Sequence, residues 1–242
     1  MKLDILAFGV HPDDVELGCA GTLLAAIAEG KKAGIIDLTQ GELGTRGTIE
    51  TRRTEAANAK KVLGIEIREN LQMADGFFFN DEAHQRKVIE AIRKYQPSIV
   101  LCNALSDRHP DHGRSASLVS DATFLSGLRK IETYHNEQLQ EAWRPSYVFH
   151  YIQDRYIEPS FAIDISVYMD KKIEAIRSYE TQFYNPELNE PQTYISSPAF
   201  LETVKARALI LGKRIGVQYA EGFISGKLLG VNSFDAFIQN PT

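Results

Sequence analysis

The segment His11-Pro12-Asp13-Asp14 follows an apolar run, Leu3 to Val10, near the start of the sequence. That run is rich in residues that suit a strand buried on both faces of a sheet. Because proline disfavours helix at the residue before it, His11 is expected in an extended or turn conformation at the strand's carboxyl end. A helix is expected from Val15 to Glu29, capped by one of the two aspartates. The stretch therefore predicts a strand, a turn that carries polar side chains, and a helix.

A second segment of this kind, His109-Pro110-Asp111-His112, follows the apolar strand Ser98 to Asn103 and precedes a helix expected from Gly113 to about Lys130. The remaining strands are expected at 33–39, 65–73, 146–152 and 161–165, and the remaining helices at 49–63, 81–95, 167–183 and 199–217. This alternation predicts one α/β domain over residues 1–242, with a Rossmann-like, mostly parallel sheet flanked by helices. Ligands bind such sheets beyond the carboxyl ends of the strands, where both segments are expected.

Composition narrows the function classes. With 27 basic and 32 acidic residues the net charge is -5, so neither nucleic acid nor a membrane surface is an expected partner. Cys19 and Cys102 lie far apart and lack a Cys-x-x-Cys spacing, which predicts buried thiols in a reducing compartment. The first apolar run ends at Val10, too early for a signal peptide. We expect a cytoplasmic protein.

Together the two segments offer enough ligands for one metal ion. His11 and Asp14, three residues apart across a strand-to-helix turn, can direct an imidazole nitrogen and a carboxylate oxygen to one point. His109 and His112 have the same spacing, and either could supply a third ligand. Three protein ligands and an open fourth position are typical of a catalytic zinc ion, although the same set suits iron(II). The pattern predicts a metal hydrolase that activates water.

Each segment alone also fits a purely structural interpretation. In the first, proline fixes φ and an aspartate caps a helix, and the second could be a polar loop. Two such clusters at the ends of predicted parallel strands favour the catalytic interpretation. His84, His135 and His150 are weaker candidates, and for His150, inside a strand, a hydrogen-bonded core role is expected.

The leading strand with His-Pro-Asp-Asp, followed by a distant His-x-Asp-His, resembles the LmbE or PIG-L family of zinc-dependent N-acetylglucosaminyl deacetylases. Further stretches resemble its bacillithiol-biosynthesis branch: Ala7-Phe8-Gly9-Val10, Gly47-Thr48-Ile49-Glu50 with Arg52 and Glu55, Asp107 to His112, and Tyr219-Ala220-Glu221-Gly222-Phe223. That branch removes acetyl from N-acetylglucosaminyl-malate. The resemblance covers Leu3 to Phe223 and also implies a homo-oligomer, commonly a hexamer in this branch.

Matching positions assign roles to the two segments. The resemblance implies zinc ligation by His11, Asp14 and His112, with Asp13 as the general base. Amide hydrolysis needs a nucleophilic water, a group that takes its proton, support for the oxyanion and an acid for the departing amine. Asp13, next to a ligand yet free of the metal, can take the proton. His109, oriented and kept cationic by Asp111, can stabilise the oxyanion or protonate the amine, and both roles stay open.

The resemblance favours Arg52 over its neighbour Arg53 as the clamp for a substrate carboxylate, which a guanidinium group can bind with two hydrogen bonds. A plain surface arginine on a helix is the structural alternative. Arg108 is a second candidate for the same contact, and Tyr194 is a candidate donor to an oxyanion. The loop Gly41 to Gly47 lacks the spacing of a nucleotide-binding loop and is expected to cover the sugar pocket.

The predicted function is the hydrolytic removal of acetyl from an N-acetylglucosamine conjugate, with N-acetylglucosaminyl-malate as the first choice. A general N-acetylglucosamine or chitooligosaccharide deacetylase is an alternative, which Arg52 and Arg108 disfavour. A non-catalytic metal-binding or sugar-binding module is an alternative of a different class. Asp13 and the pair of His109 and Asp111 disfavour it, since binding alone needs neither a base nor an acid.

Overall fold

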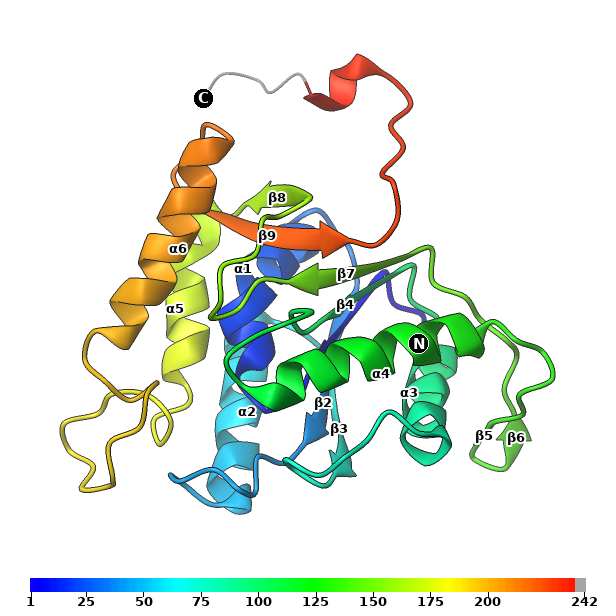
Figure 1. Cartoon of the computed structure of the whole chain (residues 1–242), viewed down its shortest axis with the longest axis horizontal. Helices are drawn as coiled ribbons and strands as arrows, with labels where there is room; N and C mark the ends of the chain where they lie inside the picture. Colours follow the sequence, from blue (N-terminus) through cyan, green and yellow to red (C-terminus); the bar gives the residue numbers. More distant parts are fainter. Residues whose placement is uncertain (238–242) are drawn as a thin grey trace.

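The computed structural model describes residues 1–237, and its centre is a seven-stranded sheet in the order β3-β2-β1-β4-β7-β9-β8 (Figure 1). The strands are β1 (Ile5–Gly9), β2 (Ala33–Thr39), β3 (Ile67–Met73), β4 (Ile99–Cys102), β7 (Tyr147–Tyr151), β8 (Phe161–Asp164) and β9 (Ala220–Ser225). The strands β3, β2, β1, β4 and β7, which are neighbours in this order, run parallel to one another. The strand β9 lies antiparallel to both β7 and β8. The predicted α/β fold with a mostly parallel sheet is confirmed.

Helices cover both faces of this sheet. They are α1 (Asp14–Ala28), α2 (Ile49–Leu63), α3 (Glu82–Tyr95), α4 (Pro110–Ser126), α5 (Met169–Arg177) and α6 (Phe200–Arg214). The helices α3 and α4 share one hydrophobic cluster with β1, β2 and β4, and α1 shares a second cluster with the opposite faces of the same strands. The third cluster lies between α2, α5 and α6. The sheet is therefore the middle layer of three.

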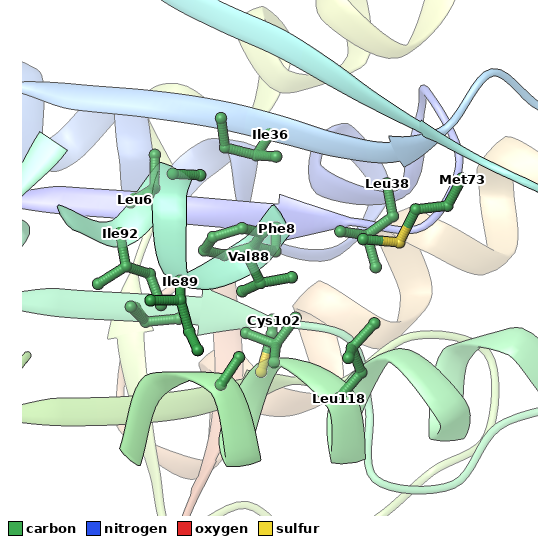
Figure 2. Packing of buried hydrophobic residues seen from close by; sticks show 14 of the residues in the cluster. Leu6, Phe8, Ile36, Leu38, Met73, Val88, Ile89, Ile92, Cys102 and Leu118 are labelled. Carbon is green, nitrogen blue, oxygen red and sulfur yellow. The ribbon is translucent and has the colours of Figure 1, made fainter. Parts of the chain in front are cut away.

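Successive buried side chains along a strand point to opposite faces of the sheet and so belong to different hydrophobic clusters, as a sheet buried on both faces requires. Leu6 and Phe8 of β1 point toward α3 and α4, whereas Ile5 and Ala7 point toward α1. Figure 2 shows the first side, where Phe8 packs between strand residues and the inward face of α3. Every one of these strand side chains is at most 8% exposed, so the register of β1 is tightly specified.

The position of β1 decides where the polar segments meet. It pairs in parallel with β2 on one side and with β4 on the other, with Ile5 opposite Ala33 and Ile99. Parallel neighbours end at the same edge of a sheet, so the residues after β1 and after β4 emerge side by side. This places the segment that starts at His11 next to the segment that starts at His109.

Several element boundaries differ from the sequence-based expectations. The helix α4 begins at Pro110 rather than Gly113, because proline is well tolerated in the first turn of a helix. The helix expected at 167–183 is shorter, since a 3₁₀ turn (η1, Ser166–Tyr168) precedes α5 and α5 ends at Arg177. The strand β9, the hairpin of β5 (Tyr134–His135) and β6 (Gln138–Leu139), and the 3₁₀ turn η2 (Phe234–Phe237) were not expected. The last part of the predicted domain, 238–242, lies outside the described residues.

Both cysteines are buried and unbridged, as the sequence predicts. Within residues 1–237 the helices are all too short or too polar to cross a membrane.

The packing of α1 against β7 yields a test of the fold. A Cβ atom added at Gly18 would lie 2.2 Å from Cδ2 of Tyr151. This ring is fully buried, and its hydroxyl group donates to the Phe8 carbonyl over 2.8 Å. We expect Gly18→Ala to lower the free energy of unfolding by about 2 kcal/mol, because overpacking of up to about 3 kcal/mol exceeds the roughly 1 kcal/mol that alanine contributes to a helix. Urea denaturation measures this, with Gly226→Ala, which meets nothing within 4 Å, as the control. Equal stability of the two variants would contradict the described packing.

Candidate active site

The two polar segments converge where β1 and β4 end. The ring centroids of His11 and His109 are 4.8 Å apart, those of His109 and His112 are 5.4 Å apart, and those of His11 and His112 are 5.8 Å apart. The segments are nearly a hundred residues apart in sequence, so the parallel pairing of the two strands is what brings the three imidazoles together.

Asp14 lies between two of these rings. Its Oδ1 atom is 3.1 Å from Nε2 of His112, and its Oδ2 atom is 3.6 Å from Nδ1 of His11. Zinc bonds of about 2.0 to 2.2 Å in tetrahedral geometry place neighbouring ligand atoms roughly 3.3 to 3.5 Å apart. Both separations are therefore close to those of atoms that share one ion. The donor set of two imidazoles and one carboxylate fits zinc and iron(II) alike.

The Asp14 carboxylate is held in place by four donors. Its Oδ2 atom accepts hydrogen bonds from the backbone N–H groups of Val10 and His11 and from the side-chain amide of Asn103, and Oδ1 accepts from the side-chain amide of Gln153. Burial alone would raise the pKa of Asp14, but the neighbouring His112 and His11 and these bonds hold it well below its usual range. Asp14 is therefore ionised, as a metal ligand must be.

Each of these two histidines has a buried carboxylate behind it. Nε2 of His11 lies 3.0 Å from Oδ1 of Asp75, and Nδ1 of His112 lies 2.5 Å from Oδ2 of Asp107. A carboxylate only accepts, so these ring nitrogens carry the protons and the opposite nitrogens face Asp14. Outer carboxylates of this kind fix the tautomer and orientation of metal-binding imidazoles. Despite burial, Asp14 and Asp107 raise the pKa of His112 to about 10, so a metal ion that bound this ring would have to displace a proton from it.

Two other groups of side chains could also hold an ion. Ligand atoms of His11, His109 and His112 lie within 4.8 Å of one another, and so do those of His11, Asp75 and Asp111. In the second group, however, the Asp111 carboxylate already accepts from the Gly76 N–H and from Arg114. His109 is thus the main competitor of Asp14 for a place among the ligands.

Asp13 has an unusual backbone and an unusual acidity. Its φ angle is 128°, a strained value for a residue other than glycine, and strain of this sort concentrates at functional sites. The carboxylate is buried, and burial raises its pKa to about 7 against the lowering effect of Arg52. The expectation that an aspartate caps α1 is wrong. Asp13 occupies the N-cap position without a side-chain bond, and the Asp14 carboxylate instead accepts from the preceding turn.

Arg52 lies in the wall of the site rather than free within it. One terminal nitrogen donates to Oε1 of Gln182 over 3.1 Å, and the other donates to the Pro12 carbonyl over 2.6 Å and to Oδ2 of Asp13 over 3.2 Å. The side chain is only 5% exposed, and Gly41 packs so closely that a Cβ atom there would lie 2.7 Å from the guanidinium group. The sequence assigns the two terminal nitrogens of Arg52 to a substrate carboxylate, but in the structure both have protein partners. The turn before α1 places the Pro12 carbonyl and Asp13 within hydrogen-bond distance of one of them.

His109 and Asp111 do not form the pair that the sequence suggests. His109 is the N-cap residue of α4, and its Nδ1 atom accepts from the backbone N–H of Asp111 over 3.3 Å. Among the described residues the Asp111 carboxylate bonds to Gly76 and Arg114. Burial, followed by the neighbouring His11 and His112, lowers the pKa of His109, so this ring is neutral rather than held cationic by Asp111.

All three predicted ligands, together with Asp13, His109 and Arg52, line one cavity of about 230 Å³, whereas Asp111 lies behind it. Two loops with no expected ligand role close its other sides. The Gly41 to Gly47 loop contributes Leu43 and Gly44, and the segment before α6 contributes Tyr194, whose hydroxyl group donates to Asp154 over 2.9 Å. Arg108 lies over the Tyr194 ring, 4.4 Å from its centroid.

The sequence interpretation assigned no role to Asp75, Asn103, Asp107 or Gln153, which surround the ligands. Three of them share one signal, since each is a polar residue within two positions of the end of a parallel strand, namely Asp75 after β3, Asn103 after β4 and Gln153 after β7. A search for polar residues at strand ends could have found these three.

Two imidazoles that flank an ionised carboxylate, beside a second buried carboxylate whose pKa is about 7, fit the chemistry of a metal-dependent hydrolase. Comparison with known proteins gives the same class. The family model described as PIG-L, GlcNAc-PI de-N-acetylase, matches residues 6–123.

Three relatives illustrate the likeness. The conserved protein TT1542 from Thermus thermophilus has 37% sequence identity to this chain. Its crystal structure matches the fold with a TM-score of 0.84 and covers 95% of this chain and 97% of that chain. Diacetylchitobiose deacetylase of Thermococcus kodakarensis is 28% identical over 95% of this chain and 86% of its own length. A probable N-acetyl-alpha-D-glucosaminyl L-malate deacetylase 2 of Bacillus anthracis is 25% identical over 72% of this chain and 78% of its own length.

The chain belongs to the PIG-L family of deacetylases. It is a hydrolytic enzyme that removes N-acetyl groups.

The burial of Arg52 and the exposure of its neighbour Arg53 provide a matched pair of variants. We expect Arg52→Met to lower the free energy of unfolding by about 3 kcal/mol, because it leaves Asp13 and the Pro12 carbonyl without their donor. Arg53→Met should change it by no more than about 0.5 kcal/mol. Urea denaturation of both variants measures the difference, and similar stabilities would show that Arg52 does not support the site.

Proposed function

We propose that this enzyme is a zinc-dependent deacetylase of N-acetylglucosamine conjugates, in which His11, Asp14 and His112 bind the ion and Asp13 is the general base. One observation carries the proposal. Asp14 lies between two imidazoles that are each oriented by a buried carboxylate. The carboxylate of Asp13, the residue before it, instead accepts a hydrogen bond from Arg52. The two aspartates of one turn therefore have the separate environments that a ligand and a base require.

A bound zinc ion supplies a Lewis acid that polarises the amide carbonyl and makes water more acidic. The residues of the chain do the remaining work. Asp13 takes the proton of the attacking water, and a pKa of about 7, set mainly by burial, suits a base that works near neutral pH. The C–N bond then breaks, acetate leaves, and the amine receives a proton. Because the His109 ring lies in the cavity beside His11, we assign to it the hydrogen bond to the developing oxyanion or the delivery of that proton.

For the substrate we propose a conjugate with a negatively charged substituent, such as N-acetylglucosaminyl-malate. Arg108 and Arg207 both line the cavity, in addition to the occupied Arg52. Arg108 is exposed and only loosely paired, 3.7 Å from Asp154, so it can turn to a carboxylate of the ligand. The likeness to the probable malate-conjugate deacetylase supports this choice.

The second candidate is the deacetylation of a neutral oligosaccharide of N-acetylglucosamine. The longer alignment with diacetylchitobiose deacetylase favours it. The two candidates share the ligands and the base, and they differ only in what the rim of the cavity must bind. The rim residues therefore provide the test.

The division of roles within one turn predicts opposite outcomes for two variants. Asp13→Asn should retain one zinc ion per chain, since asparagine tolerates a positive φ, but should lose roughly 100- to 10,000-fold in turnover as expected for a missing general base. His11→Ala should lose the metal. Metal analysis and an assay of free amine release measure both, with His84→Ala, a histidine on the outer face of α3 that contacts Asp81, as the control. Normal turnover by Asp13→Asn would contradict the assignment.

Arg108 separates the two substrate classes. We expect Arg108→Gln to raise KM for N-acetylglucosaminyl-malate about tenfold, as loss of a hydrogen bond to a charged group implies, and to leave KM for diacetylchitobiose within about twofold. Steady-state amine release from both substrates by the wild type and the variant provides the measurement. If the wild type prefers diacetylchitobiose, or if the variant weakens both substrates equally, the malate conjugate is not the substrate.

A further inference from the structure

The carboxylate behind His11 does more than orient the ring. Oδ1 of Asp75 accepts from Nε2 of His11 over 3.0 Å, and Oδ2 of Asp75 accepts from the backbone N–H of Leu43 over 3.0 Å. One side chain thus bonds at the same time to a proposed metal ligand and to the glycine-rich loop that closes the cavity.

The contact between Asp75 and this loop runs in both directions. The backbone N–H of Asp75 donates to Oε1 of Glu42 over 2.8 Å, while Oε2 of Glu42 accepts from the backbone N–H of Gln40 over 3.2 Å. The start of the loop is therefore bonded to Asp75 through both a backbone donor and a side-chain acceptor. Asp75 itself is only 6% exposed, so water competes little for these bonds.

The loop residues held in this way belong to the cavity. Leu43 and Gly44 line it, and Leu43 also presents much of its side chain to solvent, with 62% exposed. The Leu43 side chain lies against Gly76 and is positioned by the backbone bond to Asp75, so it can move when that bond changes. The strength of the bond from the Leu43 N–H to Asp75 depends on the negative charge of the Asp75 carboxylate. The same carboxylate accepts from the His11 ring.

Charge links the two ends of this bridge. An ion on Nδ1 of His11 withdraws electrons from the ring and strengthens the bond from Nε2–H to Asp75, and the ordered carboxylate then offers its other oxygen to Leu43 in a fixed position. In the other direction, a loop that is bonded to Asp75 holds the carboxylate where it orients the ring. Occupancy of the metal site and closure of the loop must then favour each other, because such coupling is reciprocal.

We infer that Asp75 is a positioning residue that couples zinc binding at His11 to the closed conformation of the 40–47 loop over the substrate cavity. The inference rests on the proposed function for the identity of the ion. It adds to that function a way in which a loaded metal site favours closure of the cavity.

Asp75→Asn tests the bridge with almost no change in shape. In asparagine one of the two carboxylate oxygens is replaced by an NH2 group, which cannot accept. Because His11 and Leu43 donate to different oxygens of Asp75, one of the two bonds is lost. The matched control is Asp81→Asn, because Asp81 makes the same kind of contact, 2.8 Å from Nδ1 of His84, on the exposed surface at the start of α3.

Two readouts apply, neither of which is catalytic activity. The zinc dissociation constant, measured by competition with a chromophoric chelator, should rise roughly 10- to 100-fold in Asp75→Asn and stay within twofold in Asp81→Asn. Hydrogen exchange of the Leu43 amide should slow when zinc is added to the wild type and to Asp81→Asn, but not in Asp75→Asn. A merely structural role of Asp75 would change Leu43 exchange equally with and without zinc.

The wild-type exchange measurement keeps the test valid even if Asp75→Asn folds poorly. Leu43 exchange that is independent of zinc in the wild type, or wild-type zinc affinity in Asp75→Asn, would overturn the inference. A wild type that shows the coupling but releases no amine from any N-acetylglucosamine conjugate would contradict the proposed function while it supports the role of Asp75.

Discussion

The carboxylate of Asp14 connects the three strands on whose ends the site is built. It accepts hydrogen bonds from Val10 and His11 after β1, from Asn103 after β4 and from Gln153 after β7. Its charge in turn raises the pKa of His112. A buried carboxylate with so many donors is stable only while all of them stay in place, because an unmet buried charge costs about 3 to 5 kcal/mol. The geometry of the proposed metal ligands and the arrangement of the strand ends therefore depend on each other.

The same turn places a second aspartate in a quite different state. Asp13 has a positive φ and a pKa raised by burial, and Arg52, followed by His11, offsets part of the cost of its charge. Neither feature stabilises the protein, since the backbone strain alone costs on the order of 1 to 3 kcal/mol. The proposed role of Asp13 as general base explains why the chain retains them, because hydrolysis of an amide requires a carboxylate that can take a proton near neutral pH.

Much of the fold and of the site could be predicted from the sequence. Buried parallel strands read as apolar runs, so β1, β2 and β4 were expected, and the polar segments after two of them led to His11, Asp14 and His112. The strand β9 was missed because glycines interrupt the tail in which it lies, and its pairing partners are distant in sequence. The bridge through Asp75 rests on a contact across 64 residues, which no local pattern encodes. The positive φ of Asp13 was likewise not expected. Arg52 lines the expected cavity, and its contact with the Pro12 carbonyl was not expected, since it depends on how α2 packs beside the turn.

The central claim is that one turn divides its two aspartates between metal binding and proton transfer. Anomalous diffraction at the zinc edge from crystals of the zinc-loaded wild type tests it most directly. The account predicts one peak about 2.0 to 2.2 Å from Nδ1 of His11, a carboxylate oxygen of Asp14 and Nε2 of His112, with Asp13 outside the coordination sphere. A peak bonded to Asp13, or one held by His11, His109 and His112 without Asp14, would contradict it.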